Sequence, residues 1–200
     1  MWPLLHALQL TCLVLLLGWG LHRLVLLLGY WRLKVRRTAA DPEPSHWPRV
    51  LVQLPLYNER DVAAQAIRAV GALDYPAELL EVQVLDDSDD GTVEICAEEV
   101  ALLAKRGVGA THVRRGSRKG FKAGALAHGL ELSDAAYVAV FDADFQPRPD
   151  FLRRAVARLQ STGSALVQAR WDHLNRDERQ LTRAQGALLD AHFAIEHQVR

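Results

Sequence analysis

Cysteine is scarce in this sequence, and its charges cancel. The 200 residues include only two cysteines, Cys12 and Cys96, and neither has a neighbour at the spacing of a zinc or redox motif. This usage fits a reducing cytosol. The 24 basic residues equal the 24 acidic ones, so the formal net charge is zero and no overall basicity favours a nucleic-acid partner.

Three common binding motifs are also missing. No Gly-x-x-x-x-Gly-Lys-Ser/Thr sequence occurs, which excludes a P-loop. Gly107 and Gly109 follow a predicted helix instead of a strand and lack the third glycine of a dinucleotide-binding fingerprint. His192 and His197 are five residues apart, off the i, i+4 face of a helical zinc site. Two nucleotide-binding folds and a zinc site are therefore disfavoured.

A long apolar run is present at the amino terminus. Residues 2–31 carry one formal charge, Arg23, and as a helix would rise roughly 45 Å, more than the ~30 Å hydrocarbon layer. A transmembrane anchor is predicted instead of a signal peptide, because no basic segment precedes the run and no Ala-x-Ala site follows it. Basic residues come directly after it and place the rest of the chain in the cytosol: Arg32, Lys34, Arg36 and Arg37. The expected location is a membrane, of the inner, plasma or Golgi type, with the lipid bilayer as a partner.

The remaining sequence alternates between strand and helix patterns. Residues 1–37 form the anchor with its basic segment, 38–48 are a proline-containing linker, and 49–200 are one domain. Apolar strands are predicted at 49–55, 81–87, 110–115, 137–144 and 164–170, and helices at 60–73, 91–107, 121–132 and 150–160. This alternation predicts an α/β fold with a mostly parallel sheet and helices on both faces.

Polar residues follow three of the predicted strands, at 55–59, 86–90 and 142–144. Ligands of parallel sheets bind beyond the carboxyl ends of the strands, so these loops should converge on one edge. Asp142 and Asp144 are predicted to bind Mg²⁺ or Mn²⁺, since hard carboxylate oxygens suit both ions; the alternative is a pair of solvated turn carboxylates. The strand that positions them is expected to be buried through Tyr137, Val138, Val140 and Phe141.

Two further segments suit a nucleotide. Asp86 and Asp87 end a strand and can accept hydrogen bonds from a base or ribose, although a turn that caps the helix from Gly91 explains them equally. Residues 114–126 combine arginines and lysines with glycines that allow close backbone approach, which suits a diphosphate. A solvated basic loop is the alternative.

Five segments, in this order and spacing, resemble a processive family-2 glycosyltransferase, closest to the cellulose-synthase-like A and C group: QLPLYNE, VQVLDDS, RKGFKAGAL, YVAVFDADFQP and ALVQARW. The resemblance implies a Rossmann-like GT-A fold in a membrane-anchored, inverting β-glycosyltransferase. Such an enzyme would move a hexose from GDP-mannose or UDP-glucose to a growing polysaccharide.

The resemblance also assigns roles to single residues. It implies that Tyr57, Glu59, Asp86 and Asp87 line the nucleoside pocket and that Lys122 contacts the diphosphate. Asp142 and Asp144 would bind the metal, and Asp142 would also contact the donor. Gln168 and Arg170 would lie near the donor and acceptor sugars. The Mg²⁺ or Mn²⁺ ion would bridge the two phosphates.

The chain departs from the family at its carboxyl end. The family's catalytic base, in a Thr-Glu-Asp motif, and its Gln-x-x-Arg-Trp motif are absent, so no catalytic residue is predicted here and the base is expected beyond Arg200. We interpret the chain as an amino-terminal fragment. One alternative is a non-catalytic membrane-tethered donor-binding module. Another is a haloacid-dehalogenase-like phosphatase, which is disfavoured because Phe145 follows the second aspartate and the motif lies on the fourth predicted strand.

Overall fold

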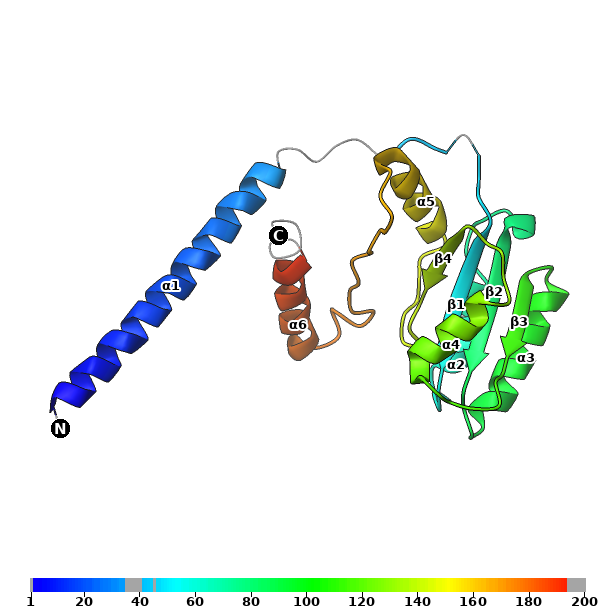
Figure 1. The fold of residues 1–200 in the computed structure, drawn as a ribbon, viewed down its shortest axis with the longest axis horizontal. Coiled ribbons are helices and arrows are strands. Elements are labelled where there is room, and N and C mark those ends of the chain that lie inside the picture. Colours follow the sequence, from blue (N-terminus) through cyan, green and yellow to red (C-terminus); the bar gives the residue numbers. More distant parts are fainter. Residues whose placement is uncertain (1, 35–40, 45, 194–200) are drawn as a thin grey trace. The chain divides into compact units, whose positions relative to one another are not determined.

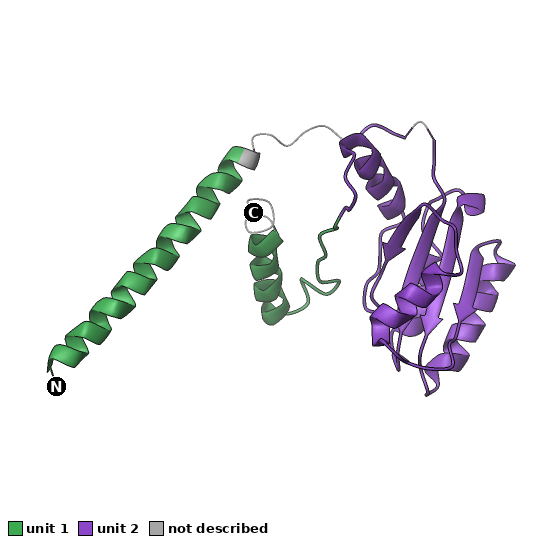
Figure 2. Ribbon diagram, viewed as in Figure 1, with its two compact units in different colours: residues 1–40, 168–200 green, residues 41–167 purple. Residues whose placement is uncertain are grey.

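The computed structural model describes residues 2–34, 41–44 and 46–193 (Figure 1). The chain divides into two compact units, which are residues 41–167 and residues 1–40 together with 168–200 (Figure 2). The first of these contains the sheet. The other contains the amino-terminal helix α1 and the helix α6, Gln180–Ala191.

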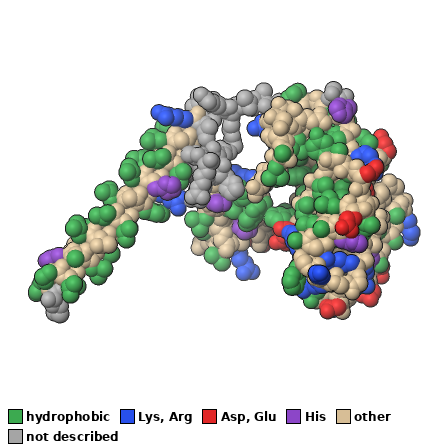
Figure 3. Space-filling model, in the orientation of Figure 1, with side chains coloured by type: hydrophobic (Ala, Val, Ile, Leu, Met, Phe, Trp, Pro, Cys, Tyr) green, Lys and Arg blue, Asp and Glu red, His purple; other side chains and the backbone are tan. Residues whose placement is uncertain are grey.

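The apolar amino-terminal run forms one helix, α1, Trp2–Lys34. Trp2–Arg32 contains an 18-residue window with a mean hydropathy of 2.0 and is long and apolar enough to cross a membrane. Hydrophobic side chains line the visible face of the helix along its length (Figure 3). The predicted helix is therefore confirmed. Of the basic residues after it, Arg36 and Arg37 lie outside the described residues.

Four parallel strands form the sheet of unit 41–167, in the order β3-β2-β1-β4. They are β1, Val50–Leu56; β2, Leu80–Asp86; β3, Gly109–Val113; and β4, Tyr137–Val140. The predicted parallel sheet is confirmed. Because all strands run the same way, the loops that follow them leave from the same edge.

Helices cover both faces of this sheet, as predicted. They are α2, Ala63–Val70; α3, Thr92–Lys105; α4, Phe121–Leu130; and α5, Phe151–Thr162, with a short 3-10 turn at Ala77–Leu79. Helices α2 and α3 pack against each other and against one face, and α4 crosses the other face over β1 and β2 (Figure 1).

The larger core lies between the sheet and helices α2, α3 and α5. Helix α2 turns Ala63, Ala66, Ile67 and Val70 towards it, at the i, i+3, i+4, i+7 spacing of one helical face, and all four are buried. Alternate residues of β1 and β2 meet them, and Leu51 and Leu85 are buried on the other face, which explains why these strands read as near-continuous apolar runs. Central β1 is thereby held on both sides and supports the residues that follow it.

Two buried glutamines lie under α4 on the opposite face. Gln53 Nε2 donates to Gln83 Oε1 at 3.2 Å and to the Leu126 carbonyl oxygen at 3.1 Å. Helix α4 comes this close because Gly129 has no side chain, since a Cβ there would lie 2.5 Å from both glutamine side chains. The hydrogen bonds satisfy the buried amides and fix the helix that carries Lys122.

The prediction that β4 is buried on both faces is wrong. Val138 and Val140 are 44% and 46% exposed, whereas Phe141 is buried. Strand register places these valines beside Leu51 and Gln53, on the face that α4 covers. Helix α4 contacts β1 and β2, so this face of the edge strand β4 stays exposed.

A strand predicted at 164–170 does not form. The structure has irregular backbone there, and Leu166 is 79% exposed. The residue types suit a strand, but strand preference depends on packing against neighbouring strands and helices. Among the described residues, no strand pairs with this segment.

The described part of the predicted linker 38–48 lies against the domain. Trp47 packs edge-to-face on Tyr75, with ring centroids 5.5 Å apart, and the Tyr75 hydroxyl donates to the Pro48 carbonyl oxygen at 2.7 Å. The Asp41 carboxylate accepts a hydrogen bond of 2.8 Å from the hydroxyl group of Ser161, a residue of α5. The compact unit accordingly begins at Asp41.

Candidate functional site

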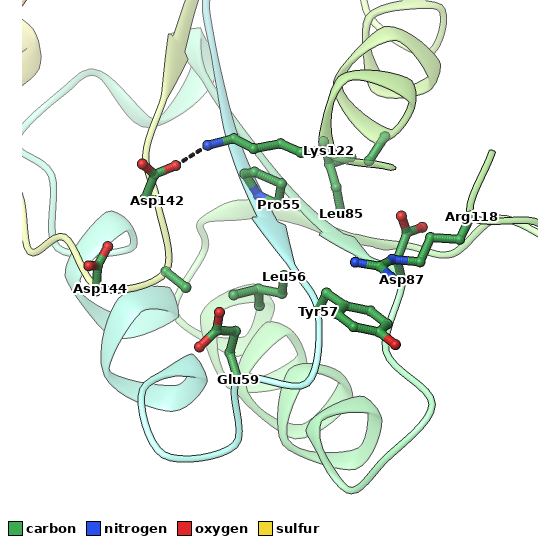
Figure 4. Close-up of a pocket in the computed structure, with 12 residues that line it drawn as sticks. Pro55, Leu56, Tyr57, Glu59, Leu85, Asp87, Arg118, Lys122, Asp142 and Asp144 are labelled. Atoms are coloured by element: carbon green, nitrogen blue, oxygen red, sulfur yellow. Dashed lines mark hydrogen bonds and ion pairs between the residues drawn. The ribbon is translucent and has the colours of Figure 1, made fainter. Parts of the chain in front are cut away.

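A pocket lies at the carboxyl ends of the strands, where the predicted loops converge (Figure 4). Its lining comes from the ends of β1 and β2, the turn after β4, and the start of α4. The lining residues are Pro55, Leu56, Tyr57, Glu59, Leu85, Asp87, Arg118, Lys122, Ala125, Asp142, Ala143 and Asp144. Apolar side chains form part of its surface, and acidic and basic groups face one another across it.

Asp142 and Asp144 lie on the turn that follows β4. The strand ends at Val140, and the Phe145 N–H donates to the Asp142 carbonyl oxygen at 3.1 Å, which closes the turn. Both carboxylates are accessible, and the ammonium group of Lys122 forms an ion pair with Asp142 (Figure 4). Two hard oxygen donors suit Mg²⁺ or Mn²⁺, and a metal would replace the Lys122 ammonium group as the partner of Asp142. These residues therefore fit the predicted metal.

Tyr57 and Arg118 face each other on the other side of the pocket. The Arg118 guanidinium carbon lies 3.2 Å from the centre of the Tyr57 ring, a cation-π contact. The next residue, Asn58, has a positive φ of 57°. Its Nδ2 donates to Asp89 Oδ1 at 2.9 Å, and its Oδ1 accepts from the Asp89 backbone N–H at 3.1 Å. The loops after β1 and β2 are thus joined, which fixes the backbone that presents Tyr57.

Asp87 takes part in a two-pronged ion pair. Arg115 donates from Nε to Asp87 Oδ1 at 2.7 Å and from Nη2 to Oδ2 at 2.5 Å. Both side chains are largely buried, with 12% and 6% of their surfaces exposed. Asp87 lines the pocket and is held in one orientation by this pair.

Asp86 points away from the pocket into a buried polar cluster. Its carboxylate lies 2.8 Å from His112 Nε2 and accepts the Ser88 N–H at 2.9 Å. Burial raises the pKa of Asp86, but its hydrogen bonds to His112 and Ser88 outweigh this, and the net shift is downward. Asp86 therefore stays ionised inside the domain.

The same cluster includes Cys96. Ligand atoms of Asp86, Cys96 and His112 all lie within 4.8 Å of one another, a set that metal ions can use. Burial raises the pKa of the Cys96 thiol to about 12, so without a cation the thiol stays protonated. Asp86 and His112 are already paired by a hydrogen bond. We interpret the cluster as a hydrogen-bonded support below the loop of Asp87.

The structure brings most of the predicted site residues together. Six line one pocket: Tyr57, Glu59, Asp87, Lys122, Asp142 and Asp144. Gln168 and Arg170 belong to the other unit, where Arg170 pairs with Asp190. The predicted roles of all these residues, and of Asp86, stay predictions. Arg115 and Arg118 were not predicted as single site residues, and their membership of the basic segment 114–126 was the only sequence signal for them.

Known proteins match this chain over most of its length. Residues 52–199 match the family Glycosyl transferase family 2. Glucomannan 4-beta-mannosyltransferase 1 of Oryza sativa subsp. japonica is 46% identical over 177 residues, which cover 82% of this chain and 34% of that protein. Glucomannan 4-beta-mannosyltransferase 2 of Arabidopsis thaliana is 43% identical over 188 residues, which cover 88% of this chain and 35% of that protein. The chain thus spans about a third of the length of these relatives.

Solved structures share the fold. The mannosyltransferase PcManGT from Pyrobaculum calidifontis, solved in complex with GDP-Man and Mn²⁺, matches with a TM-score of 0.56 and 34% identity, over 70% of this chain and 41% of that one. TarS of S. aureus matches with a TM-score of 0.55 and 20% identity, over 64% of this chain and 22% of that one. The GT-A fold predicted from the sequence is confirmed.

Proposed function

The chain belongs to glycosyl transferase family 2, and from this premise we propose that its pocket binds the nucleotide-sugar donor of a glycan-forming hexosyltransferase. The observation that carries the proposal is the meeting of Asp142, Asp144 and Lys122 with Tyr57 and Asp87 in one pocket at the sheet edge. Carboxylates for a metal, a lysine for phosphates and an aromatic face for a base are the groups that such a donor requires.

The geometry suggests how the chain's own residues divide the work. Tyr57 offers an aromatic face to the nucleoside, and Asp87 offers a fixed carboxylate beside it. Lys122 leaves Asp142 and pairs with the diphosphate, which frees the carboxylate of Asp142 beside that of Asp144. A Mg²⁺ or Mn²⁺ ion bound there would offset negative charge on the departing nucleoside diphosphate. Transfer also needs a base for the acceptor hydroxyl, and we assign this role to none of the described residues.

We favour GDP-mannose over UDP-glucose as the donor. The plant relatives are named as mannosyltransferases, and the Pyrobaculum neighbour was solved with GDP-Man and Mn²⁺. In this proposal the whole enzyme inverts the sugar's configuration and extends a β-linked polysaccharide. Helix α1 anchors it in a membrane, with domain 49–200 on the cytosolic side. The family match leaves the phosphatase alternative without support.

Calorimetric titration of the full chain in detergent tests the donor proposal. We expect GDP-mannose to bind in the presence of Mn²⁺ and to bind at least about tenfold more weakly without it, because no cation then offsets the charge of the diphosphate. UDP-glucose should bind more weakly than GDP-mannose under the same conditions. Circular dichroism establishes beforehand that the protein is folded.

The outcomes separate the parts of the proposal. Tighter binding of UDP-glucose would overturn the donor assignment but keep the family-2 chemistry. Metal-independent binding of both donors would overturn the role of Asp142 and Asp144. A folded chain that binds neither donor would overturn the proposal that this pocket suffices to hold one.

A further inference from the structure

Arg115 joins three parts of the chain although it does not itself line the pocket. Besides its two bonds to Asp87, it donates from Nη1 to the Lys119 carbonyl oxygen and from Nη2 to the Phe121 carbonyl oxygen, each at 2.8 Å. A guanidinium carries five N–H donors in a rigid, planar arrangement. Arg115 therefore ties the end of β2 to the backbone that leads into α4.

The backbone held in this way has an unusual conformation. Gly120 has a φ of 75° and Phe121 a φ of 49°, so two successive residues are left-handed. A bulky residue with positive φ is rare, and it persists only where its surroundings impose it. Phe121 is 66% exposed, so packing of its ring does not supply that constraint. Hydrogen bonds to its backbone do: the Phe121 N–H donates to the Arg118 carbonyl oxygen at 3.0 Å, and Arg115 donates to the carbonyl oxygens of Lys119 and Phe121.

Gly124 shows how closely this arrangement fits. A Cβ at Gly124 would overlap the Lys119 carbonyl oxygen and would lie 2.6 Å from Arg115 Nη1. The first turn of α4 thus packs directly against the hydrogen bond between Arg115 and Lys119. The position of α4 and the conformation of segment 117–122 are consequently coupled.

This segment carries the two cationic side chains of the pocket. Arg118 lies over the ring of Tyr57, and Lys122, at the start of α4, pairs with Asp142. Both line the pocket, on opposite sides of it (Figure 4). A shift of the segment would move both cations relative to the groups they face.

We propose that Arg115, anchored on Asp87, is a positioning residue that holds segment 117–122 so that Arg118 and Lys122 are preset for the nucleoside and the diphosphate. The proposal rests on the proposed function, because it requires the pocket to be a nucleotide-diphosphate site. It assigns Asp87 a second task, since a carboxylate that accepts two hydrogen bonds from Arg115 keeps further lone pairs for a ligand.

A double-mutant cycle tests the proposal with the full chain in detergent. GDP with Mn²⁺ is titrated into wild type, Arg115→Gln, Lys122→Gln and the double variant. We expect each single change to weaken GDP binding about tenfold or more. The double variant should bind GDP with about the affinity of the single variant that binds it more weakly, because a lysine that is no longer positioned contributes nothing more to binding. If the double variant instead lost GDP affinity by the product of the two single factors, Arg115 would act independently of Lys122, and the proposal would be overturned.

Arg68→Gln is the matched control. Arg68 and Glu99 form a second two-pronged pair, which joins α2 to α3 and has an Nε to Oε2 distance of 2.9 Å, and neither residue lines the pocket. Its loss should lower thermal stability and leave GDP affinity within about twofold of wild type. If Arg68→Gln weakened GDP binding as much as Arg115→Gln, the effect of Arg115 would be general destabilisation and the proposal would fail.

Limited trypsin digestion gives a readout that needs no nucleotide. Cleavage after Lys119 should be several-fold faster in Arg115→Gln than in wild type or Arg68→Gln, because the segment is released. Arg115→Lys, which keeps the charge but not the two-pronged geometry, replaces the glutamine variant if that one does not fold. Unchanged cleavage would overturn the holding role of Arg115. A folded wild type that binds neither GDP nor UDP with Mn²⁺ would instead overturn the proposed function, and with it the role towards a donor.

Discussion

Replacing Asp142 and Asp144 together by asparagine is expected to weaken Mn²⁺-dependent binding of GDP-mannose by about 100-fold or more. Loss of groups that merely support metal ligands costs about 10- to 100-fold in affinity, so loss of two charged ligands should cost at least as much. Both side chains are accessible, and the ion pair of Asp142 with Lys122 is half-exposed. The free energy of unfolding should therefore change by less than about 1 kcal/mol. Calorimetry and thermal melts measure the two quantities.

Asp134→Asn is the control for this change. Asp134 is an exposed aspartate that precedes β4 and pairs with Arg49, at the opposite end of that strand from the pocket. The Asp134→Asn change should leave the affinity for GDP-mannose, and the dependence of that affinity on Mn²⁺, unchanged. The metal assignment fails if the double variant still binds GDP-mannose in a Mn²⁺-dependent way with near wild-type affinity.

Asp86→Asn should have the largest effect on stability of the site variants. Its side chain is fully buried, with hydrogen bonds to His112 and the Ser88 N–H, and Arg114 lies 3.6 Å away. Hydrogen bonds to a buried charged group contribute about 1.5–3 kcal/mol, so we expect a loss of that order in the free energy of unfolding at pH 7. Urea unfolding followed by circular dichroism measures it.

The same variant should change the acid sensitivity of the domain. The pKa of Asp86 is lowered in the folded protein, so its charge stabilises the fold above the unfolded value of about 3.9. That contribution is lost as the pH falls from this value through the lower, folded pKa. Between pH 5 and 3 wild type should therefore lose more stability than Asp86→Asn, while Asp134→Asn should follow wild type. If the free energy of unfolding fell equally with pH in wild type and in Asp86→Asn, the assigned role of this carboxylate would be refuted.

The sequence was sufficient to predict the strands that are covered on both faces. Val52, Leu54, Val82 and Val84 belong to near-continuous apolar runs, and all are buried between the sheet and the helices on one of its faces. The sequence was insufficient to predict which residues of the edge strand β4 are exposed. The apolar pattern of Val138 resembles theirs, yet α4 does not reach it, and no local pattern encodes which strand a helix will cover.

The convergence of the site residues followed from strand direction alone. Their partners depended on the conformation of the loop before α4, which is determined by the left-handed Gly120 and Phe121 and by Arg115. No spacing rule gives these pairings. For Asp86 a signal existed, because residues 82, 84 and 86 alternate onto one face of β2, which α3 covers. Asp87, one residue later, turns to the pocket.

The ion pair between Lys122 and Asp142 makes ligand entry an exchange of partners. The ammonium group already neutralises the carboxylate of Asp142, so a metal that arrives alone must displace the lysine from that ion pair. A diphosphate that arrives with the metal accepts the lysine and frees the carboxylate. Binding of the two should therefore be cooperative, and the factor by which GDP tightens Mn²⁺ must equal the factor by which Mn²⁺ tightens GDP. Equal Mn²⁺ affinity with and without GDP would contradict this exchange. Mn²⁺ and a diphosphate attract each other in any case, so the share of the factor that belongs to the lysine is the part that Lys122→Gln removes.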